Sequence, residues 1–118
     1  ELIVVANLFS KINDALIPHS KNEEEILFPA IKEMVLNESP TAKKTIVSEI
    51  TRMLEEHDNA GKAMDEINRK TKSYQVPEDG CATYQVAFKM LQEFEDDLHV
   101  HVHLENNILF PRAIELAS

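Results

Sequence analysis

Several residue types that shape other folds are scarce in this chain of 118 residues. Glycine occurs twice and tryptophan not at all, and the strict apolar–polar alternation of β-strands is rare. The one cysteine cannot form a disulfide within the chain, which suits a reducing compartment. No apolar run approaches the ~18 residues that span a bilayer. These scarcities argue against a disulfide scaffold and a membrane helix, and they favour an all-α fold.

Positive charge is also in short supply. Lys and Arg number 12 against 21 Asp and Glu, and the formal net charge is −9. Because nucleic acids and anionic lipid surfaces bind positively charged protein surfaces, we expect neither nucleic acid nor membrane among the partners. Hydrophobic residues make up 43% of the chain, which is enough for one core. We therefore expect a single domain over residues 1–118.

Two short breaks divide the chain into three long segments. At the first break, NESPT (37–41), Ser39 can cap a helix and Pro40 can occupy its first position. The second break, SYQVPEDG (73–80), combines Pro and Gly with polar residues. We predict helices over roughly 2–36, 41–72 and 80–116.

Three prolines fall inside the predicted helices. Proline lacks the N–H that a helix interior needs, and its ring crowds the carbonyl four residues back. We expect Pro18 to kink the first helix just before His19, and we expect Pro29 and Pro111 to bend or fray the helices that contain them.

Apolar residues recur at alternating spacings of three and four in each predicted helix, the pattern of a face that packs against neighbouring helices. We call each such face a seam. The seams comprise Leu2, Val5, Phe9, Ile12, Leu16, His19, Glu23, Ile26 and Ala30; then Ile46, Ile50, Met53, His57, Ala60, Met64 and Ile67; then Tyr84, Ala87, Leu91, Phe94, Leu98, His101, Glu105 and Ile108. Polar side chains interrupt the seams chiefly as two His-x3-Glu pairs and the single His57.

The two His-x3-Glu pairs belong to a repeated motif. HSKNEEEILFP (19–29) and HVHLENNILFP (101–111) both read H-x3-E-x2-I-L-F-P. On a helix, residues four apart lie one turn apart on the same face, so each copy presents a His and a Glu side by side. An old duplication kept for packing would explain the ILFP half, but it does not easily explain His and Glu on a buried face.

Buried carboxylates need a positive partner. Glutamate is almost never fully buried unpaired, its burial costs several kcal/mol, and the three seams contain no Lys or Arg. A bound cation is the economical explanation. Two His-x3-Glu pairs could place imidazoles on two metals ~3.5–4 Å apart and bridge them with both carboxylates. Imidazole with carboxylate suits iron, manganese or zinc.

Three histidines and two glutamates offer fewer donor atoms than the about twelve positions of two octahedral ions. Three long helices also leave a groove rather than a closed four-helix bundle. We therefore expect a fourth helix, from a preceding segment or from a second chain, to complete the bundle, and we expect self-association through the apolar groove.

Three stretches, HSKNEEEILFP (19–29), EHDNAG (56–61) and DLHVHVHLENNILFPRA (97–113), resemble the hemerythrin-like di-iron family that repairs iron–sulfur clusters. The resemblance covers essentially the whole chain and implies a hemerythrin-like up-down four-helix bundle, of which this chain carries three long helices. It implies that the metal is iron. It also implies that the family's first bundle helix and its Cys-bearing N-terminal domain are missing here, so we expect a truncated form.

The resemblance assigns roles to five residues. His19, His57 and His101 resemble terminal iron ligands, and Glu23 and Glu105 resemble bridging carboxylates. The implied function is a cytoplasmic stress-response protein that restores iron–sulfur clusters damaged by nitric oxide or peroxide, as an iron donor more than as an enzyme. The implied partners are the iron–sulfur proteins under repair.

Other functions stay open at this point. A hemerythrin-like carrier or sensor that binds O2 or NO reversibly would use the same ligands, and a helical interaction module would use none. A ferritin-like oxidase is disfavoured, because those sites use Glu-x-x-His.

Several further polar residues are expected to face solvent because they fall off the seams. They include Glu56, Glu95, His99 and His103. Cys81 lies close to a predicted helix start, where the pKa of a thiol tends to fall.

Overall fold

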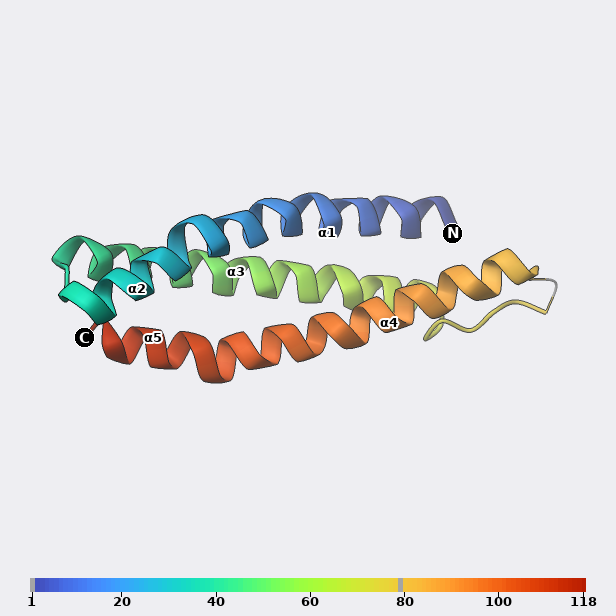
Figure 1. Ribbon diagram of the computed structural model, residues 1–118. Coiled ribbons are helices and arrows are strands. Elements are labelled where there is room, and N and C mark those ends of the chain that lie inside the picture. Colours follow the sequence, from blue (N-terminus) through green and yellow to red (C-terminus); the bar gives the residue numbers. More distant parts are fainter. Residues whose placement is uncertain (1, 79) are drawn as a thin grey trace.

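The computed structural model describes residues 2–78 and 80–118, without the side chain of Leu2. Its helical elements are α1 (Leu2–Asn22), η1 (Glu23–Leu27), α2 (Phe28–Asn37), α3 (Pro40–Lys70), α4 (Ala82–Leu104), η2 (Glu105–Leu109) and α5 (Phe110–Leu116). These elements join into three long rods that run up, down and up, with dimensions of 61 × 21 × 19 Å (Figure 1). The described ranges contain no strand, so the prediction of an all-α fold with three long helices is confirmed.

The breaks between rods follow the local sequence. The Ser39 side chain accepts a hydrogen bond from the backbone N–H of Ala42 at 3.3 Å, and Pro40 begins α3, as predicted. At the other end of α3, Lys72, Ser73 and Tyr74 have φ angles of 52°, 61° and 64°. Non-glycine residues rarely adopt such left-handed angles, and this turn ends the helix firmly.

The prolines act differently from one another. α1 passes through Pro18 without interruption, so the kink expected there does not break the helix. Departures from α-helical hydrogen bonding come just before Pro29 and Pro111, in the π-helical elements η1 and η2. There the N–H of Phe28 bonds to the carbonyl of Glu23, five residues back, and Phe110 bonds to Glu105 in the same way. The wider turn relieves the crowding between each proline ring and the carbonyl behind it.

Each π-helical element adds one residue to its turn and locally changes which side chains are buried, although Ala30, beyond η1, stays buried as predicted. Ile26, expected in the first seam, is 40% exposed, whereas its neighbour Leu27 is fully buried. In the third rod Ile108 is 48% exposed and Phe110 takes the buried position. The predictions for Ile26 and Ile108 are thus wrong, because they assumed unbroken α-helical periodicity.

The seam of α3 is buried along its whole length, as predicted, because this rod packs against both others. Apolar side chains gather around it in two separate clusters, one towards each end of the molecule. Leu27, Ile50 and Phe110 belong to the first cluster, and Ile12 and Met64 to the second. The polar seam residues lie between the two clusters.

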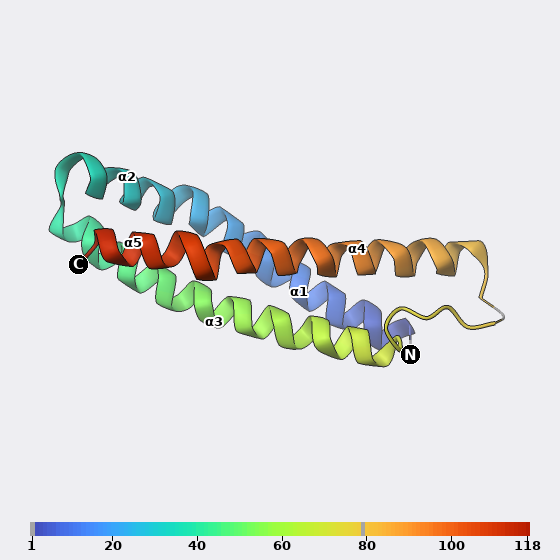
Figure 2. The same ribbon diagram turned by 90° about the horizontal axis from the view of Figure 1, so that it is seen from below.

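Helices α1 and α4 both run along α3 (Figure 2). An apolar groove lies between α1 and α4. The two helices approach each other at Phe9 and Phe94, whose ring centroids are 5.1 Å apart. The groove, of about 440 Å³, is lined by Val5, Ala6, Phe9, Ala87, Phe88, Met90, Leu91 and Phe94. Ala87, predicted to be buried, is exposed there, and Phe88 is buried instead. In the part of the chain that the structure describes, every helix is too short or too polar to cross a membrane.

Candidate metal centre

All three rods contribute to one polar cluster in the middle of the fold. His19 lies in the last turn of α1, His57 lies in α3, and His101 lies in the last turn of α4. Glu23 and Glu105 are the first residues of η1 and η2. The cluster therefore forms where both copies of the repeated motif face the middle rod.

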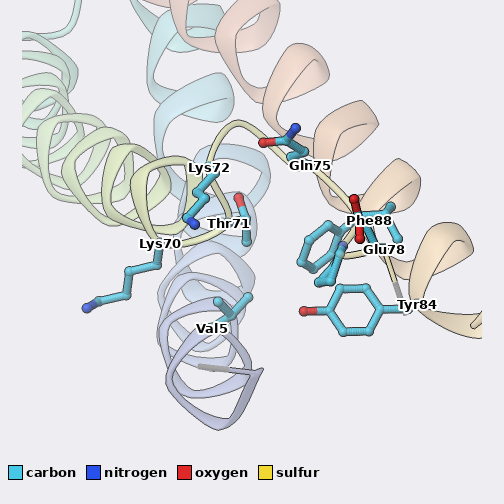
Figure 3. A pocket seen from close by; sticks show the side chains of 10 residues that line it. Val5, Lys70, Thr71, Lys72, Gln75, Glu78, Tyr84 and Phe88 are labelled. Atoms are coloured by element: carbon cyan, nitrogen blue, oxygen red, sulfur yellow. The ribbon is translucent and has the colours of Figure 1, made fainter. Parts of the chain in front are cut away.

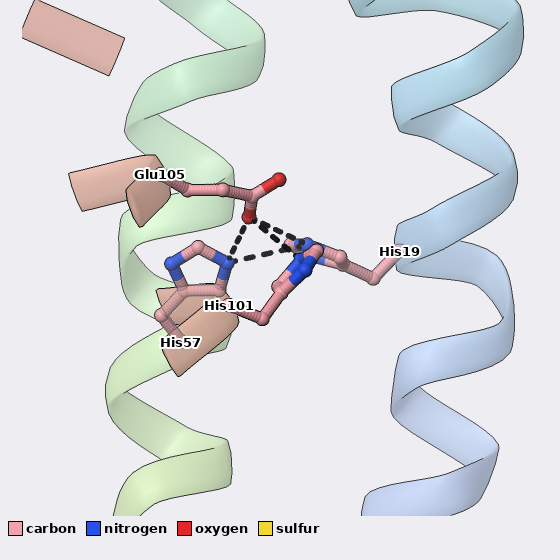
Figure 4. A group of neighbouring side chains, drawn as sticks. All are labelled: His19, His57, His101 and Glu105. Carbon is pink, nitrogen blue, oxygen red and sulfur yellow. Dashed lines mark hydrogen bonds and ion pairs between the residues drawn. The ribbon is translucent and has the colours of Figure 1, made fainter. Parts of the chain in front are cut away.

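Four of the five predicted ligands converge closely. One ligand atom from each of His19, His57, His101 and Glu105 lies within 4.8 Å of the others (Figure 4). Glu105 Oε1 is at the centre, 2.9 Å from His57 Nε2, 3.1 Å from His101 Nε2 and 3.8 Å from His19 Nε2. The fifth residue, Glu23, stands beside this group, with Oε2 3.1 Å from His19 Nε2.

The cluster is closed on most sides and open at one edge. His19, Glu23, His57 and Glu105 are buried, as predicted. The prediction of a buried His101 is wrong, because its side chain is 53% exposed. No helix of the described chain covers this side of α4, so the edge at His101 gives solvent access to the centre.

The Nδ1 atoms of the two buried imidazoles, on the ring side away from the centre, are hydrogen-bonded to side chains outside the predicted ligand set. His19 Nδ1–H donates to Glu56 Oε1 at 2.7 Å, and His57 Nδ1–H donates to Asn106 Oδ1 at 2.7 Å. The prediction that Glu56 lies on a solvated face holds only in part, because its side chain is 31% exposed and its carboxylate bonds to His19. Both bonds direct Nε2 towards the centre, where His19 Nε2 and His57 Nε2 lie 3.3 Å apart.

The charges of the cluster depend on one another. The nearby carboxylates of Glu105, Glu23 and Glu56 raise the pKa of His19 from 6.5 to about 10, against the lowering effect of burial. Burial raises the pKa of Glu23, and the carboxylate of Glu105 raises it further. Burial alone would also raise the pKa of Glu105, but the adjacent His19 and His57 rings outweigh it and hold that pKa well below its usual range.

These residues fit a cation. Glu105 Oε1 is buried and receives no well-directed hydrogen bond, although three imidazole nitrogens surround it. An ionised oxygen in such a place requires positive charge. In the metal-free protein a proton on His19 supplies part of it, and a metal ion bound by the Nε2 atoms would supply more, displacing that proton. The donor set of imidazoles and carboxylates is one that transition metals accept.

Other polar residues fall outside the cluster. His99 and His103 are exposed, as predicted. Glu95, expected to face solvent, is buried and accepts a hydrogen bond from Asn68 Nδ2 at 3.0 Å, so that prediction is wrong. Cys81 occupies the N-cap of α4 and is exposed, and backbone N–H groups of the first turn lower the pKa of its thiol.

A separate hollow of about 400 Å³ lies where α3 leads into α4, beside Val5, Lys70, Lys72 and Tyr84 (Figure 3). Lys70 is thirteen residues beyond His57 on the same helix, which places it about 20 Å along α3 from the cluster. Among the described residues that line the hollow, Glu78 is the one carboxylate and histidine is absent, so the hollow is separate from the candidate metal centre.

An antiparallel helical bundle with a central cluster of His and Glu is the architecture of hemerythrin-like cation-binding domains. The chain matches the hemerythrin HHE cation binding domain over residues 2–113, and it belongs to that family. The domain's name and the convergent His/Glu cluster together identify a metal-binding protein.

The curated relatives carry a common name. The chain is 34% identical over 110 residues to the iron-sulfur cluster repair protein YtfE of Enterobacter sp. (strain 638), covering 93% of this chain and 47% of that protein. It is 39% identical over 103 residues to YtfE of Dickeya chrysanthemi (87% and 43%), and 29% identical over 111 residues to ScdA of Staphylococcus epidermidis (94% and 48%). The chain thus spans about half the length of these relatives.

Proposed function

We propose that this chain binds a carboxylate-bridged pair of iron ions and donates iron as cargo to damaged iron–sulfur clusters. The proposed ligands are His19, Glu23, His57, His101 and Glu105. The observation that carries the proposal is Glu105 Oε1, a buried oxygen without a directed hydrogen bond at the meeting point of three imidazoles. Glu23, whose carboxylate lies beside His19, would provide the second bridge.

The ligands narrow the choice of metal, and the names of the relatives favour iron within that choice. Mixed imidazole and carboxylate ligands suit iron as well as manganese and zinc, and the curated relatives are named for iron–sulfur cluster repair. Bound iron would supply a labile, redox-active ion. The chain's own residues would hold that ion through nitrogens that also bind protons, so that acidification favours its release.

The open edge of the cluster suits a donor. The half-exposed His101 lies between the buried ligands and solvent, so an ion could leave on that side without unfolding of the bundle. The partners would be iron–sulfur proteins that have lost iron to nitric oxide or oxidative damage in the cytoplasm. A second copy of this chain would cover the apolar groove between α1 and α4 and complete the bundle.

Anaerobic loading with Fe²⁺ followed by transfer tests the proposal. We expect about two iron ions per chain, and we expect iron to move to a damaged cluster protein, restoring its visible absorption. A chain with Glu105→Ala should bind little iron and restore little absorption. Iron at background level in the unaltered chain, or iron that stays bound while the clusters remain damaged, would contradict the proposal.

The exposed edge at His101 also favours a second candidate, a reversible binder of O2 or NO. A small molecule could reach the centre there. In that case the iron-loaded protein would change its absorption on adding O2 or NO and recover on their removal, with no iron passed to the cluster protein.

A further inference from the structure

The two buried histidines of the centre have chemically different partners behind them. Glu56 Oε1 accepts the Nδ1–H of His19, and Asn106 Oδ1 accepts the Nδ1–H of His57, both at 2.7 Å. The rings themselves are equally buried. The two bonds are equal in length, so the difference between them is the charge of the acceptor.

A carboxylate acceptor strengthens an imidazole as a ligand more than an amide does. Hydrogen bonds to an ionised acceptor are roughly twice as strong as those between neutral groups. By drawing on the Nδ1 proton, the acceptor raises electron density at Nε2, the atom that faces the metal. His19 therefore has the more basic Nε2 of the two.

Neighbouring groups keep both arrangements in place. Arg52 Nε lies 3.9 Å from Glu56 Oε2, which leaves Oε1 free for His19. The His57 ring is stacked on Phe110, with centroids 5.6 Å apart and planes at 12°. Since Asn106 directly follows Glu105, consecutive residues of η2 contact Nδ1 and Nε2 of the same ring, at 2.7 and 2.9 Å. Neither ring can turn to exchange its partner without disturbing this packing.

We propose that Glu56 and Asn106 are positioning residues that make the two buried histidines unequal ligands, with His19 the anchor and His57 the ligand that releases the metal first. This inference rests on the proposed metal site. It adds a direction to iron donation: the metal detaches from the His57 side, which adjoins the half-exposed His101, while His19 still holds it.

Two substitutions would give both histidines the same kind of acceptor, one with two amides and the other with two carboxylates. Glu56→Gln replaces the carboxylate with an amide, and Asn106→Asp replaces the amide with a carboxylate. Loss of such a hydrogen-bond partner typically changes metal affinity about 10–100-fold. With Zn²⁺ or Fe²⁺ as the probe and a chelator in excess, we expect Glu56→Gln to speed metal release at least about tenfold and Asn106→Asp to slow it by a similar factor.

Each variant has a control that changes the same charge one residue away. Glu55 and Asn107 are exposed and lie outside the cluster. Glu55→Gln and Asn107→Asp should leave the release rate within about twofold of the unaltered chain, because a solvated charge is screened. If the controls reproduce the effects, or if both test variants shift the rate in the same direction, the inference is overturned.

Ring proton resonances of the Zn²⁺-loaded protein give a readout that does not depend on release. In the unaltered chain we expect two Nδ1–H signals that exchange slowly with water, with the His19 signal further downfield because its acceptor is charged. Glu56→Gln should move the His19 signal upfield and leave that of His57 in place. Two signals at the same position, or Nε2–H signals instead, would overturn the inference even where a variant fails to fold. Absence of Zn²⁺ and Fe²⁺ binding by the unaltered chain would instead refute the metal site itself.

Discussion

The carboxylate oxygen of Glu105 is the single atom on which the centre depends most. It is buried, it is close to all three imidazoles, and it receives no directed hydrogen bond. An ionised group in this position is stable only beside positive charge, so the side chain is better explained as a ligand than as part of the core.

Replacing this side chain should therefore remove the metal. We expect Glu105→Ala to lose most of the bound metal, because it deletes the central donor, whereas His103→Ala should keep it. His103 is exposed on the same helix, and its ring accepts a hydrogen bond from Asn107 Nδ2 at 3.0 Å. Metal content after desalting, measured by atomic emission, compares the two variants. Equal losses of metal from the two variants would show that the buried helix face does not identify the ligands.

The stability of the metal-free protein should fall as the pH rises from about 6.5 to about 10. The pKa of His19 is 6.5 in an unfolded chain and about 10 in the fold, so its protonated form stabilises the fold below pH 6.5 and that contribution disappears as His19 loses its proton. Three carboxylates face this ring, those of Glu105, Glu23 and Glu56. The effect should be on the order of a few kcal/mol.

Urea unfolding at several pH values, with metal removed, measures this dependence. His19→Gln should flatten it between pH 6.5 and 10, since glutamine does not titrate. A stability that stays constant over this range in the unaltered chain would contradict the raised pKa.

All five proposed ligands could be chosen from the sequence, but not the residues behind them. Spacing along one helix identifies which side chains share a face, whereas the partner of a ring Nδ1 depends on how two helices are rotated against each other. One signal was available: Glu56 directly precedes His57, and Asn106 directly follows Glu105. A residue directly beside one ligand in the sequence is therefore a candidate to hydrogen-bond the ring of a ligand on another helix.

At the scale of elements, the two π-helical segments are the feature that periodicity could not predict. Counting in threes and fours assumes that every turn is α-helical, and each extra residue moves the following side chains by about 100° around the axis. The repeated motif gives a local indication, because the same proline follows the same I-L-F in both copies. The π-helical turns let the His-x3-Glu pair face the centre while Leu27 and Phe110 remain in the core.

The turn that ends α3 offers a test of element stability. The N–H of Ser73 bonds to the Asn68 carbonyl at 2.8 Å and that of Lys72 to the Arg69 carbonyl at 3.2 Å, the pattern of a Schellman motif. Glycine is the usual residue at the left-handed position, which Lys72 occupies here with a φ of 52°. We expect Lys72→Gly to raise the free energy of unfolding by about 1 kcal/mol, because glycine adopts this angle without strain.

Guanidinium unfolding measures that change. Lys44→Gly is the matched control, since Lys44 is exposed inside α3, and there glycine should lower stability by about 1 kcal/mol. Destabilisation by both substitutions would show that the turn carries no strain at Lys72.

At the scale of the whole molecule, three rods leave one side of α1 and α4 uncovered. The helices, their order and the open groove follow from periodicity and from two clear breaks in the sequence. The exposure of Ala87 and His101 could not be predicted in this way. A seam pattern shows which residues could be buried, but it does not show whether a neighbouring helix is present to bury them.

The uncovered groove should drive self-association, because its lining is apolar throughout. Sedimentation velocity over a range of concentrations should reveal dimers. Met90→Lys, inside the groove, should shift the equilibrium towards monomers about tenfold or more, since it would bury a charge. Val35→Lys alters a similarly exposed apolar residue on α2, away from the groove lining, and should have little effect. A monomer at every concentration would argue against association between copies.

The polar centre sits between two apolar clusters that make up the core. Charged and polar side chains therefore separate the two apolar clusters, so the hydrophobic core is not continuous from one end of the bundle to the other. An ion bound there would join the two clusters, and we expect them to unfold together while it is bound and to open and exchange their amide hydrogens separately once it is lost. Delivery of the cargo would thus leave a looser molecule than the one that arrived.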